Sequence, residues 1–217
     1  MQIQRTNNYN PNFQAYKLSS ITDRAKKIDI YSLTSKDGDI IDRMLNVARG
    51  QKFPDDSKKL GTGSVKEIFN NALKRAKKIT ASSNDKVLLA VEDNSRITGI
   101  MDIREAGDMH VKGLAVWNGN NTTRDGLVST ALNDVYKTTK DFACLILPTA
   151  KSSDTIKTYF RKLGFKTPKD FGNKDLMVEG HNLQTTIEKI KNQFGDNYID
   201  LKQKKNFDLK EVLKLDE

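Results

Sequence analysis

The sequence is poor in the residues that cross-link secreted domains and in the long apolar runs that span membranes. A single cysteine in 217 residues allows no disulfide within the chain, which fits a reducing compartment. No apolar run approaches the roughly 18 residues of a membrane-spanning helix, and the longest, residues 87–91 and 142–147, have the length of strands. The first eight residues lack the apolar segment of a secretory signal. We therefore expect a soluble, cytoplasmic protein.

Motifs of several catalytic classes are also missing. His110 and His181 are the only histidines, and neither lies near a suggestive cysteine or serine motif. This absence argues against Ser-His-Asp or Cys-His catalysis and against a Cys/His metal site, so we predict no metal. Cys144 lies within an apolar strand-like segment, and we interpret it as a small core residue.

The positive charge is concentrated in the first third of the chain. Residues 1–83 carry 16 basic and 8 acidic side chains, whereas the rest is nearly neutral, and the formal net charge is +9. Such a field attracts polyanions or an acidic partner. A nucleic-acid-binding function ranks last among our hypotheses, because the basic residues are not interleaved with aromatics and no nucleic-acid motif is present.

Three segments are expected along the chain. Residues 1–20 are rich in asparagine without apolar periodicity and predict a mobile leader. Residues 21–180 form the predicted domain. Residues 181–217 form a C-terminal helical extension, with amphipathic helices at 183–194 and from about Asp208, which pack on the body or on a second copy in a homo-oligomer.

Within the domain, residues 27–33 predict a first strand, and Asp39 caps a helix that ends at Gly50. A loop at 51–63 precedes the clearest helix, in which Ser64 and Glu67 form a capping box. Strands follow at 87–92, 96–104 and 110–117, then a helix, a strand at 142–147, a second helix, and short strands at 165–167 and 176–179. The order predicts an α/β (α+β) fold, a mixed sheet flanked by helices.

A strand that leads through a short polar loop into a helix N-terminus can bind an anion such as a pyrophosphate, because free N–H groups converge there. Residues 111–126 have this pattern. The chain resembles the GNAT family, the GCN5-related N-acetyltransferases. The resemblance rests on this loop, on the order of elements, on the strand Leu114-Ala115-Val116 and on the segment Tyr159-Phe160-Arg161-Lys162-Leu163-Gly164-Phe165. The resemblance covers residues 27–179 and implies a mostly antiparallel sheet.

The resemblance also implies an acetyl-CoA site between the strands at 110–117 and 142–147. The pantetheine arm then pairs with the backbone of Leu114, Ala115 and Val116. The pyrophosphate then lies on the turn formed by Thr123, Arg124, Asp125, Gly126, Leu127 and Val128. The turn departs from the family pattern at Thr123, where relatives have Gln or Arg, and at Val128, where they have Gly or Ala.

The catalytic candidates are Glu105 and His110 as bases and Tyr159 as an acid, with Asp102 as a weaker base. Phe160 stands where relatives often have the general-acid tyrosine. Tyr159 lies one position earlier, about 100° around the helix, so we expect its ring to point elsewhere, into the core for example. The backbone N–H of Val116 is placed to polarise the thioester carbonyl, and Trp117 to line the acceptor pocket.

The sequence leaves two functions open ahead of nucleic-acid binding. The first is an acetyl-CoA-dependent N-acetyltransferase, an acyltransferase that modifies an amine of a small molecule or a protein. The alternative is a GNAT-like binding protein that has lost the chemistry. Acceptor-binding loops are expected at 34–39 and 51–63, where Asp37, Asp39, Asp55 and Asp56 offer carboxylates to a cationic amine.

Overall fold

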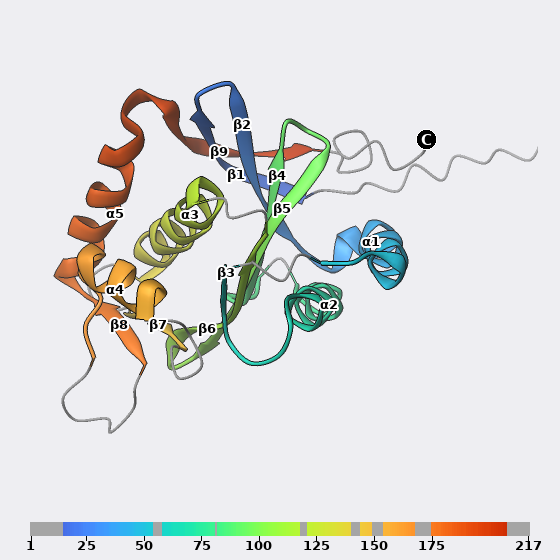
Figure 1. The fold of residues 1–217 in the computed structure, drawn as a ribbon, viewed down its shortest axis with the longest axis horizontal. Coiled ribbons are helices and arrows are strands. Elements are labelled where there is room, and N and C mark those ends of the chain that lie inside the picture. Colours follow the sequence, from blue (N-terminus) through green and yellow to red (C-terminus); the bar gives the residue numbers. More distant parts are fainter. Residues whose placement is uncertain are drawn as a thin grey trace, which may run out of the picture.

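The computed structural model describes residues 15–53, 58–80, 82–117, 121–139, 144–148, 154–167 and 175–207. In these ranges the chain forms nine strands and five α-helices (Figure 1). The strands are β1 (Ala15–Asp23), β2 (Lys26–Leu33), β3 (Lys58–Leu60), β4 (Lys86–Glu92), β5 (Arg96–Ala106), β6 (Asp108–Val116), β7 (Cys144–Leu147), β8 (Leu176–Glu179) and β9 (Tyr198–Phe207). The helices are α1 (Gly38–Gly50), α2 (Val65–Ala76), α3 (Asn121–Thr139), α4 (Asp154–Leu163) and α5 (His181–Phe194).

All nine strands belong to one sheet in the order β8-β7-β6-β5-β4-β2-β1-β9, and β3 pairs with β6 apart from this row. The pairs are antiparallel except for β6 with β7. The prediction of a mixed, mostly antiparallel sheet flanked by helices is confirmed.

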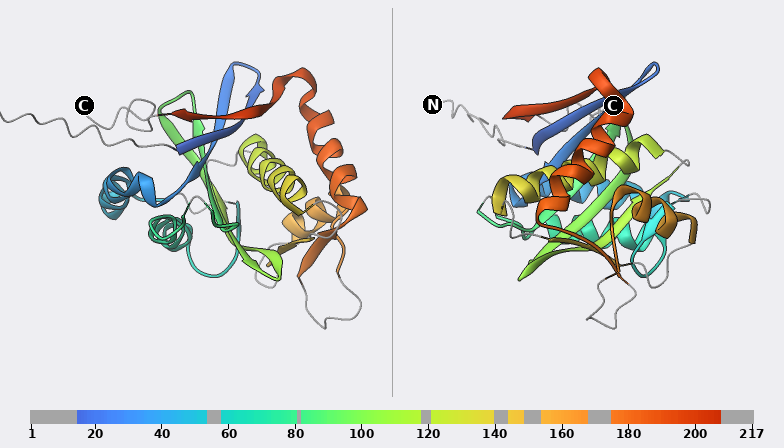
Figure 2. Two further views of the ribbon diagram at one scale, coloured as in Figure 1. Left: turned by 180° about the vertical axis from the view of Figure 1, so that it is seen from behind. Right: turned by 90° about the vertical axis from the view of Figure 1, so that its left-hand side faces the viewer.

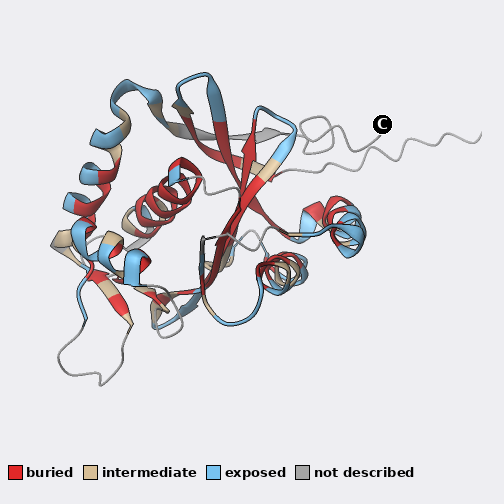
Figure 3. Ribbon diagram, viewed as in Figure 1, coloured by how far each residue is buried: buried red, intermediate tan, exposed pale blue. Residues whose placement is uncertain are grey.

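Helices cover both faces of the sheet. In Figures 1 and 2, α1 and α2 lie on one face, and α3, α4 and α5 on the other. Strand β4 shows how this arrangement uses the sequence: Leu88 and Ala90 pack in the core under α3, whereas Val87, Leu89 and Val91 pack under α1 and α2. A strand buried on both faces needs a continuous apolar run, which is the pattern that predicted it. Figure 3 shows the buried strands between the two helical layers.

The helix starts follow local capping. At α2 the predicted capping box is present, with the Glu67 N–H donating to Ser64 Oγ at 3.2 Å and the Ser64 N–H to Glu67 Oε2 at 2.6 Å. At α1 the prediction was wrong by a few residues. Thr34 and Asp37 form a capping box around the short 3-10 turn Ser35–Asp37, and Asp39 lies inside the first helical turn.

Strand β1 begins at Ala15, inside the segment predicted as a leader, so that boundary was wrong; residues 1–14 lie outside the described ranges. The strand lacks apolar alternation because several of its buried side chains are polar. Lys17 pairs with Asp29 at 2.6 Å, and the hydroxyls of Ser19 and Thr130 lie 2.6 Å apart. These partners come from distant parts of the chain, so no local sequence pattern predicts the strand.

The C-terminal segment also differs from the prediction of a purely helical extension. Helix α5 matches the predicted helix at 183–194, but the chain then forms β9, which pairs with β1 at the edge of the sheet. The helix predicted from Asp208 lies outside the described ranges. None of the helices in the described part of the chain combines the length and the apolar character that a membrane crossing requires.

Candidate functional site

Strands β6 and β7 run parallel but stay paired over two positions only. Met109 lies opposite Leu145, and His110 lies opposite Ile146. Beyond these pairs β6 continues to Val116, whereas β7 ends at Leu147. The predicted acetyl-CoA site lies at this divergence, along the free part of β6.

Strand β3 occupies the edge of β6 that we predicted to bind the pantetheine arm. Residues Lys58–Leu60 pair with β6 on one side, and β5 pairs with the same residues of β6 on the other. The side chain of Leu60 is buried in the core. In this conformation the backbone of Leu114, Ala115 and Val116 is not open to a pantetheine arm, so the predicted role requires β3 to leave.

Strand β3 could not be predicted from the sequence, because its three residues include two lysines and show no apolar pattern; they lie in the predicted loop 51–63. The glycine that follows it explains the close approach. Gly61 has a φ of 101°, and a Cβ at this position would lie 2.8 Å from the carbonyl oxygen of Lys112 on β6. A residue without a side chain is therefore needed where the chain turns away from β6.

Helix α3 begins at Asn121, earlier than the sequence predicted, and this shift overturns the predicted pyrophosphate turn. Residues 123–128 lie inside the helix, with Thr123, Leu127 and Val128 fully buried and Arg124 and Asp125 nearly so. Only the first few N–H groups of a helix are free, so those of residues 125–128 bond within α3. A phosphate on this helix would meet residues up to Thr123, and not the segment around Gly126.

Gly126 itself is a packing residue. A Cβ built on it would lie 2.5 Å from Cδ1 of Ile21 and 3.6 Å from Cδ1 of Ile30. The missing side chain thus lets α3 lie close against β1 and β2. The sequence analysis had instead interpreted Gly126 as a phosphate-binding residue.

A charged cluster joins α3 to α4. The hydroxyl of Tyr159 donates a hydrogen bond to Asp125 Oδ1, and Arg124 Nε donates to the same oxygen at 2.9 Å. The Arg124 guanidinium also stacks on the Tyr159 ring, 3.4 Å from its centroid. Burial, together with the Asp125 carboxylate, raises the pKa of Tyr159 well above its ordinary value. Tyr159 is therefore a protonated donor at the contact of the two helices.

Tyr159 is partly buried and packs against the core at its contact with α3, whereas Phe160 lies within the core itself. Phe160 is fully buried and packs edge-on against Phe165, with ring centroids 5.3 Å apart. Two adjacent aromatic residues on a helix point about 100° apart, and here the phenylalanine faces the core while the tyrosine faces α3.

The two predicted bases are not brought together. Glu105 lies opposite Met109, and His110 lies opposite Arg104. Paired residues share a face of the sheet and successive residues alternate, so Glu105 and His110 point to opposite faces. Glu105 is exposed and accepts hydrogen bonds from Asn84 at 3.1 Å.

Asp102, the weaker base candidate, is part of an ion-pair network. Arg75 of α2 donates to Asp102 Oδ1 at 2.7 Å, to Asp85 Oδ2 at 2.7 Å and to the carbonyl of Ile103 at 2.6 Å. Burial raises the pKa of Asp102, although Arg75 opposes the rise. The arrangement ties α2 to β5, and it leaves Asp102 engaged by a guanidinium.

The remaining candidates have structural surroundings. Trp117 donates its indole N–H to the carbonyl of Ile97 at 2.7 Å and packs edge-on against Phe53 and Phe69. Cys144 is buried as predicted, and burial raises the pKa of its thiol to about 12. Of the acceptor-loop carboxylates, Asp37 caps the turn before α1, while residues 55 and 56 lie outside the described ranges.

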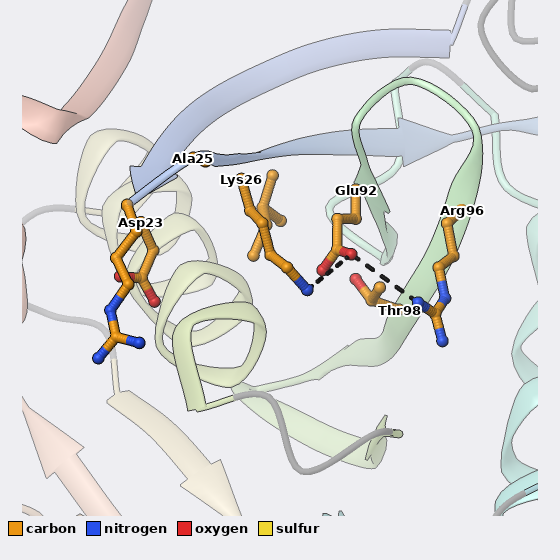
Figure 4. A pocket seen from close by; sticks show the side chains of 8 residues that line it. Asp23, Ala25, Lys26, Glu92, Arg96 and Thr98 are labelled. Atoms are coloured by element: carbon orange, nitrogen blue, oxygen red, sulfur yellow. Dashed lines mark hydrogen bonds and ion pairs between the residues drawn. The ribbon is translucent and has the colours of Figure 1, made fainter.

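A cavity of about 430 Å³ lies between the β1–β2 and β4–β5 turns, near the start of α3 (Figure 4). Its lining includes Arg24, Lys26, Arg96, Glu92 and Thr98. The sequence pointed only to a basic excess around residues 24–27. It could not show that Arg96, some seventy residues later, lies at the same cavity.

Comparisons with known proteins agree with this architecture. No family profile and no curated protein matches the sequence. Among solved structures, the chain is similar to apo FdhC, described as a nucleotide-linked sugar GNAT, with a TM-score of 0.51, 8% identity, and 82% of this chain and 96% of that chain covered.

Two further structures are similar at lower scores. One is an N-acetyltransferase from Staphylococcus aureus Mu50, with a TM-score of 0.42, 14% identity, and 70% and 97% of the two chains covered. The other is a variant of the spermidine N-acetyltransferase SpeG from Vibrio cholerae, with a TM-score of 0.44, 10% identity, and 70% and 93% covered. The likeness to FdhC, whose TM-score exceeds 0.5, together with the sheet order, shows that the chain has a divergent form of the GNAT fold.

Proposed function

We propose that the protein is an N-acetyltransferase that transfers the acetyl group of acetyl-CoA to an amine of a small molecule or a protein. The observation that supports this proposal is the divergence of β6 from β7 after two residue pairs. Most of β6 is therefore not paired with β7, and four residues separate the last residue of β6 from the first residue of α3.

Acetyl-CoA supplies an activated acyl group. The chain must bind it, accept a proton from the acceptor amine and donate a proton to the leaving thiolate. The β6 edge at residues 114–116 would hold the cosubstrate through backbone groups. Tyr159, whose pKa is raised by burial, keeps its proton at neutral pH and is our candidate for the general acid; its hydroxyl bonds to Asp125 of α3. Glu105, exposed at the far end of β5, is the carboxylate available to take a proton from an acceptor amine.

The cosubstrate does not fit the described conformation, because β3 occupies the edge. Binding therefore requires β3 to separate from β6 and Leu60 to leave the core. Burial of one leucine side chain contributes about 1.5–3 kcal/mol, so this step would weaken the apparent affinity about 10- to 150-fold. A requirement of this size is compatible with a working enzyme.

A second candidate is a GNAT-fold protein that binds a partner without catalysis. Two observations favour it. Strand β3 pairs with the edge of β6, and Phe160 is buried in the core at the position where relatives often have the general-acid tyrosine. In this case β3 is a permanent part of the sheet.

A reversible lock on β3 separates the two candidates. Lys59 lies directly opposite Ala115, and opposed residues of antiparallel strands have Cβ atoms close enough for a disulfide after a small adjustment. We would combine Lys59→Cys with Ala115→Cys and titrate acetyl-CoA by calorimetry into the reduced and the oxidised protein. The unmodified chain under the same redox conditions is the control, since its one thiol is buried.

For a transferase we expect the reduced variant and the unmodified chain to bind acetyl-CoA and the oxidised variant to lose binding. Ligand at about 100 times its Kd should also add about 2.7 kcal/mol to the stability of the unlocked forms. Absence of binding by the unmodified chain at millimolar acetyl-CoA would leave only the second candidate. Equal binding by the locked and unlocked forms would show that acetyl-CoA does not bind at the edge of β6.

A further inference from the structure

We propose that the cavity between the β1–β2 and β4–β5 turns binds a small phosphorylated ligand through its phosphate group. The proposal concerns a site that is separate from the edge of β6. It rests on the cations around the cavity, on the carboxylate that holds two of them together, and on the size and lining of the space (Figure 4).

Three cations from two hairpins surround the cavity. Arg24 and Lys26 come from the β1–β2 hairpin, and Arg96 comes from the start of β5. The side chains of Lys26 and Arg96 are 59% and 58% exposed, so most of their donors remain accessible. An ammonium has three N–H donors and a guanidinium has five in a planar fork, the geometry that suits phosphate oxygens.

Glu92 holds two of these cations toward one point. Its carboxylate is nearly buried and lies 3.2 Å from Lys26 Nζ and 4.0 Å from Arg96 Nη1. Two cations on neighbouring hairpins would otherwise repel each other, whereas the shared carboxylate fixes both of them beside the cavity. The group of three retains a net positive charge, so the hollow stays attractive to an anion.

The other carboxylate of the lining, Asp23, keeps its charge, and the lining still carries one more cation than carboxylates. Thr122, in the first turn of α3, donates its hydroxyl to Asp23 Oδ2 at 2.5 Å, and Thr123 donates to Thr98 Oγ1 at 3.1 Å. These bonds bring the start of α3 to the rim of the cavity, where the helix dipole adds a partial positive charge to that of the side chains.

The space suits a ligand larger than phosphate alone. A volume of about 430 Å³ falls within the range of small-molecule sites. Ala25 and Ile28 contribute apolar surface, which would contact the organic part of a phosphate monoester.

Arg24 adds a second, independent sign that this turn is not shaped for stability alone. Its φ is 57°, in the left-handed region that glycine adopts more readily than arginine. A two-residue turn built for stability would favour glycine there, and the arginine instead places a cation at the cavity.

The test uses the full chain with phenyl phosphate as the organic monoester and inorganic phosphate as the minimal probe, each followed by calorimetry and by ³¹P NMR. We would compare Arg96→Gln and Lys26→Gln with the matched control Lys189→Gln, an exposed lysine on α5. Circular dichroism would confirm that each variant is folded, and malonate would serve as the carboxylate competitor.

We expect saturable binding of phenyl phosphate, weakened about tenfold by either cavity variant, unchanged in the control and reduced by added salt. Arg24→Gly should weaken binding while the melting temperature stays equal or rises. Absence of saturable binding up to about 10 mM, or equal binding by the cavity variants, would overturn the site. Tighter binding of malonate would overturn the phosphate assignment, and displacement of phenyl phosphate by S-acetylpantetheine, which carries no phosphate, would overturn the separation of the cavity from the β6 edge.

Discussion

Asp125 is the residue on which the contact between α3 and α4 depends. Its Oδ1 accepts hydrogen bonds from both Tyr159 and Arg124, and its side chain is 7% exposed. A buried carboxylate that loses one of its donors keeps a charge that water cannot reach. Such a loss costs about 1–3 kcal/mol for a buried group.

We therefore expect Tyr159→Phe to lower the free energy of unfolding by about 1–2 kcal/mol. If the protein is a transferase, the same variant should also lower kcat, because the proton donor at this contact is gone. Urea denaturation and a thiol-release assay measure the two effects. Tyr136→Phe is the matched control, since its hydroxyl bonds to Gln184 at 3.2 Å on an exposed surface. Equal stability of the two variants would contradict the role given to Asp125.

Gly126→Asp should destabilise the protein by at least about 3 kcal/mol, because the new carboxylate would be buried against Ile21 and Ile30 without a partner. A phosphate-binding glycine would behave differently, since the variant would fold and only lose ligand. Thermal denaturation followed by circular dichroism decides between these roles. The control is Gly38→Asp, where a Cβ meets nothing within 4 Å and an acidic group in the first turn of α1 is favourable. If Gly126→Asp has the same melting temperature as the control, the predicted role of Gly126 in phosphate binding would stand.

At the level of elements, the edge strand β9 is held to the helical layer by Asp200. Asn133 of α3 donates to Asp200 Oδ2 at 2.6 Å, and the ammonium groups of Lys137 and Lys191 lie at 3.2 and 3.6 Å from the same oxygen. Burial alone would raise the pKa of Asp200, but the bond from Asn133 and the two lysines hold it below its ordinary value. The carboxylate thus anchors the last strand of the sheet row, which pairs with β1 alone among the described strands.

This lowered pKa makes the anchor depend on pH in a definite direction. The stabilisation is complete above the unfolded-state pKa of about 3.9 and is lost as the pH falls through the lower folded-state value. Asp200→Asn should therefore reduce stability by about 1 kcal/mol at pH 7, and the difference from the unmodified protein should shrink toward pH 3. Urea melts at pH 7, 5 and 3 measure this trend. Asp154→Asn, at a side chain that is 97% exposed, should show no such trend; a constant difference for Asp200→Asn would contradict the anchor.

For the whole molecule, β1 connects parts that are far apart in the chain. It pairs with β2 and β9, and Ser19 bonds to Thr130 of α3. Its Lys17 neutralises Asp29, a buried carboxylate of β2, at 2.6 Å. Burial lowers the pKa of Lys17, although Asp29 opposes the change.

Removal of residues 1–20, the segment that the sequence presented as a leader, should abolish cooperative unfolding, because β9 loses its neighbour and Asp29 loses its buried partner. In the full chain, Lys17→Met should cost about 3–5 kcal/mol for the same reason. Calorimetric melting measures both, with Lys27→Met as the control, since Lys27 is exposed and 3.9 Å from Asp29. Native-like melting of the truncated chain would show that β1 is dispensable.

Elements with strong local patterns could be predicted from the sequence alone. The buried run of β4 and the apolar stripe of α2 with its Ser64–Glu67 cap depend on residues that are neighbours in the chain. The order of these elements, with the segment around Phe160 and Gly164, also sufficed to indicate the GNAT fold.

The tertiary structure decided where that fold departs from the pattern. Strand β1 is held by Asp29 and Thr130, β3 by the edge of β6, and β9 by Asp200, and in each case the partner lies far away in the chain. Tyr159 is set toward Asp125 because Phe160, its neighbour, fills the core. Local sequence determines which helices and strands can form; long-range partners alone determine whether a polar strand is buried and which backbone edge stays open.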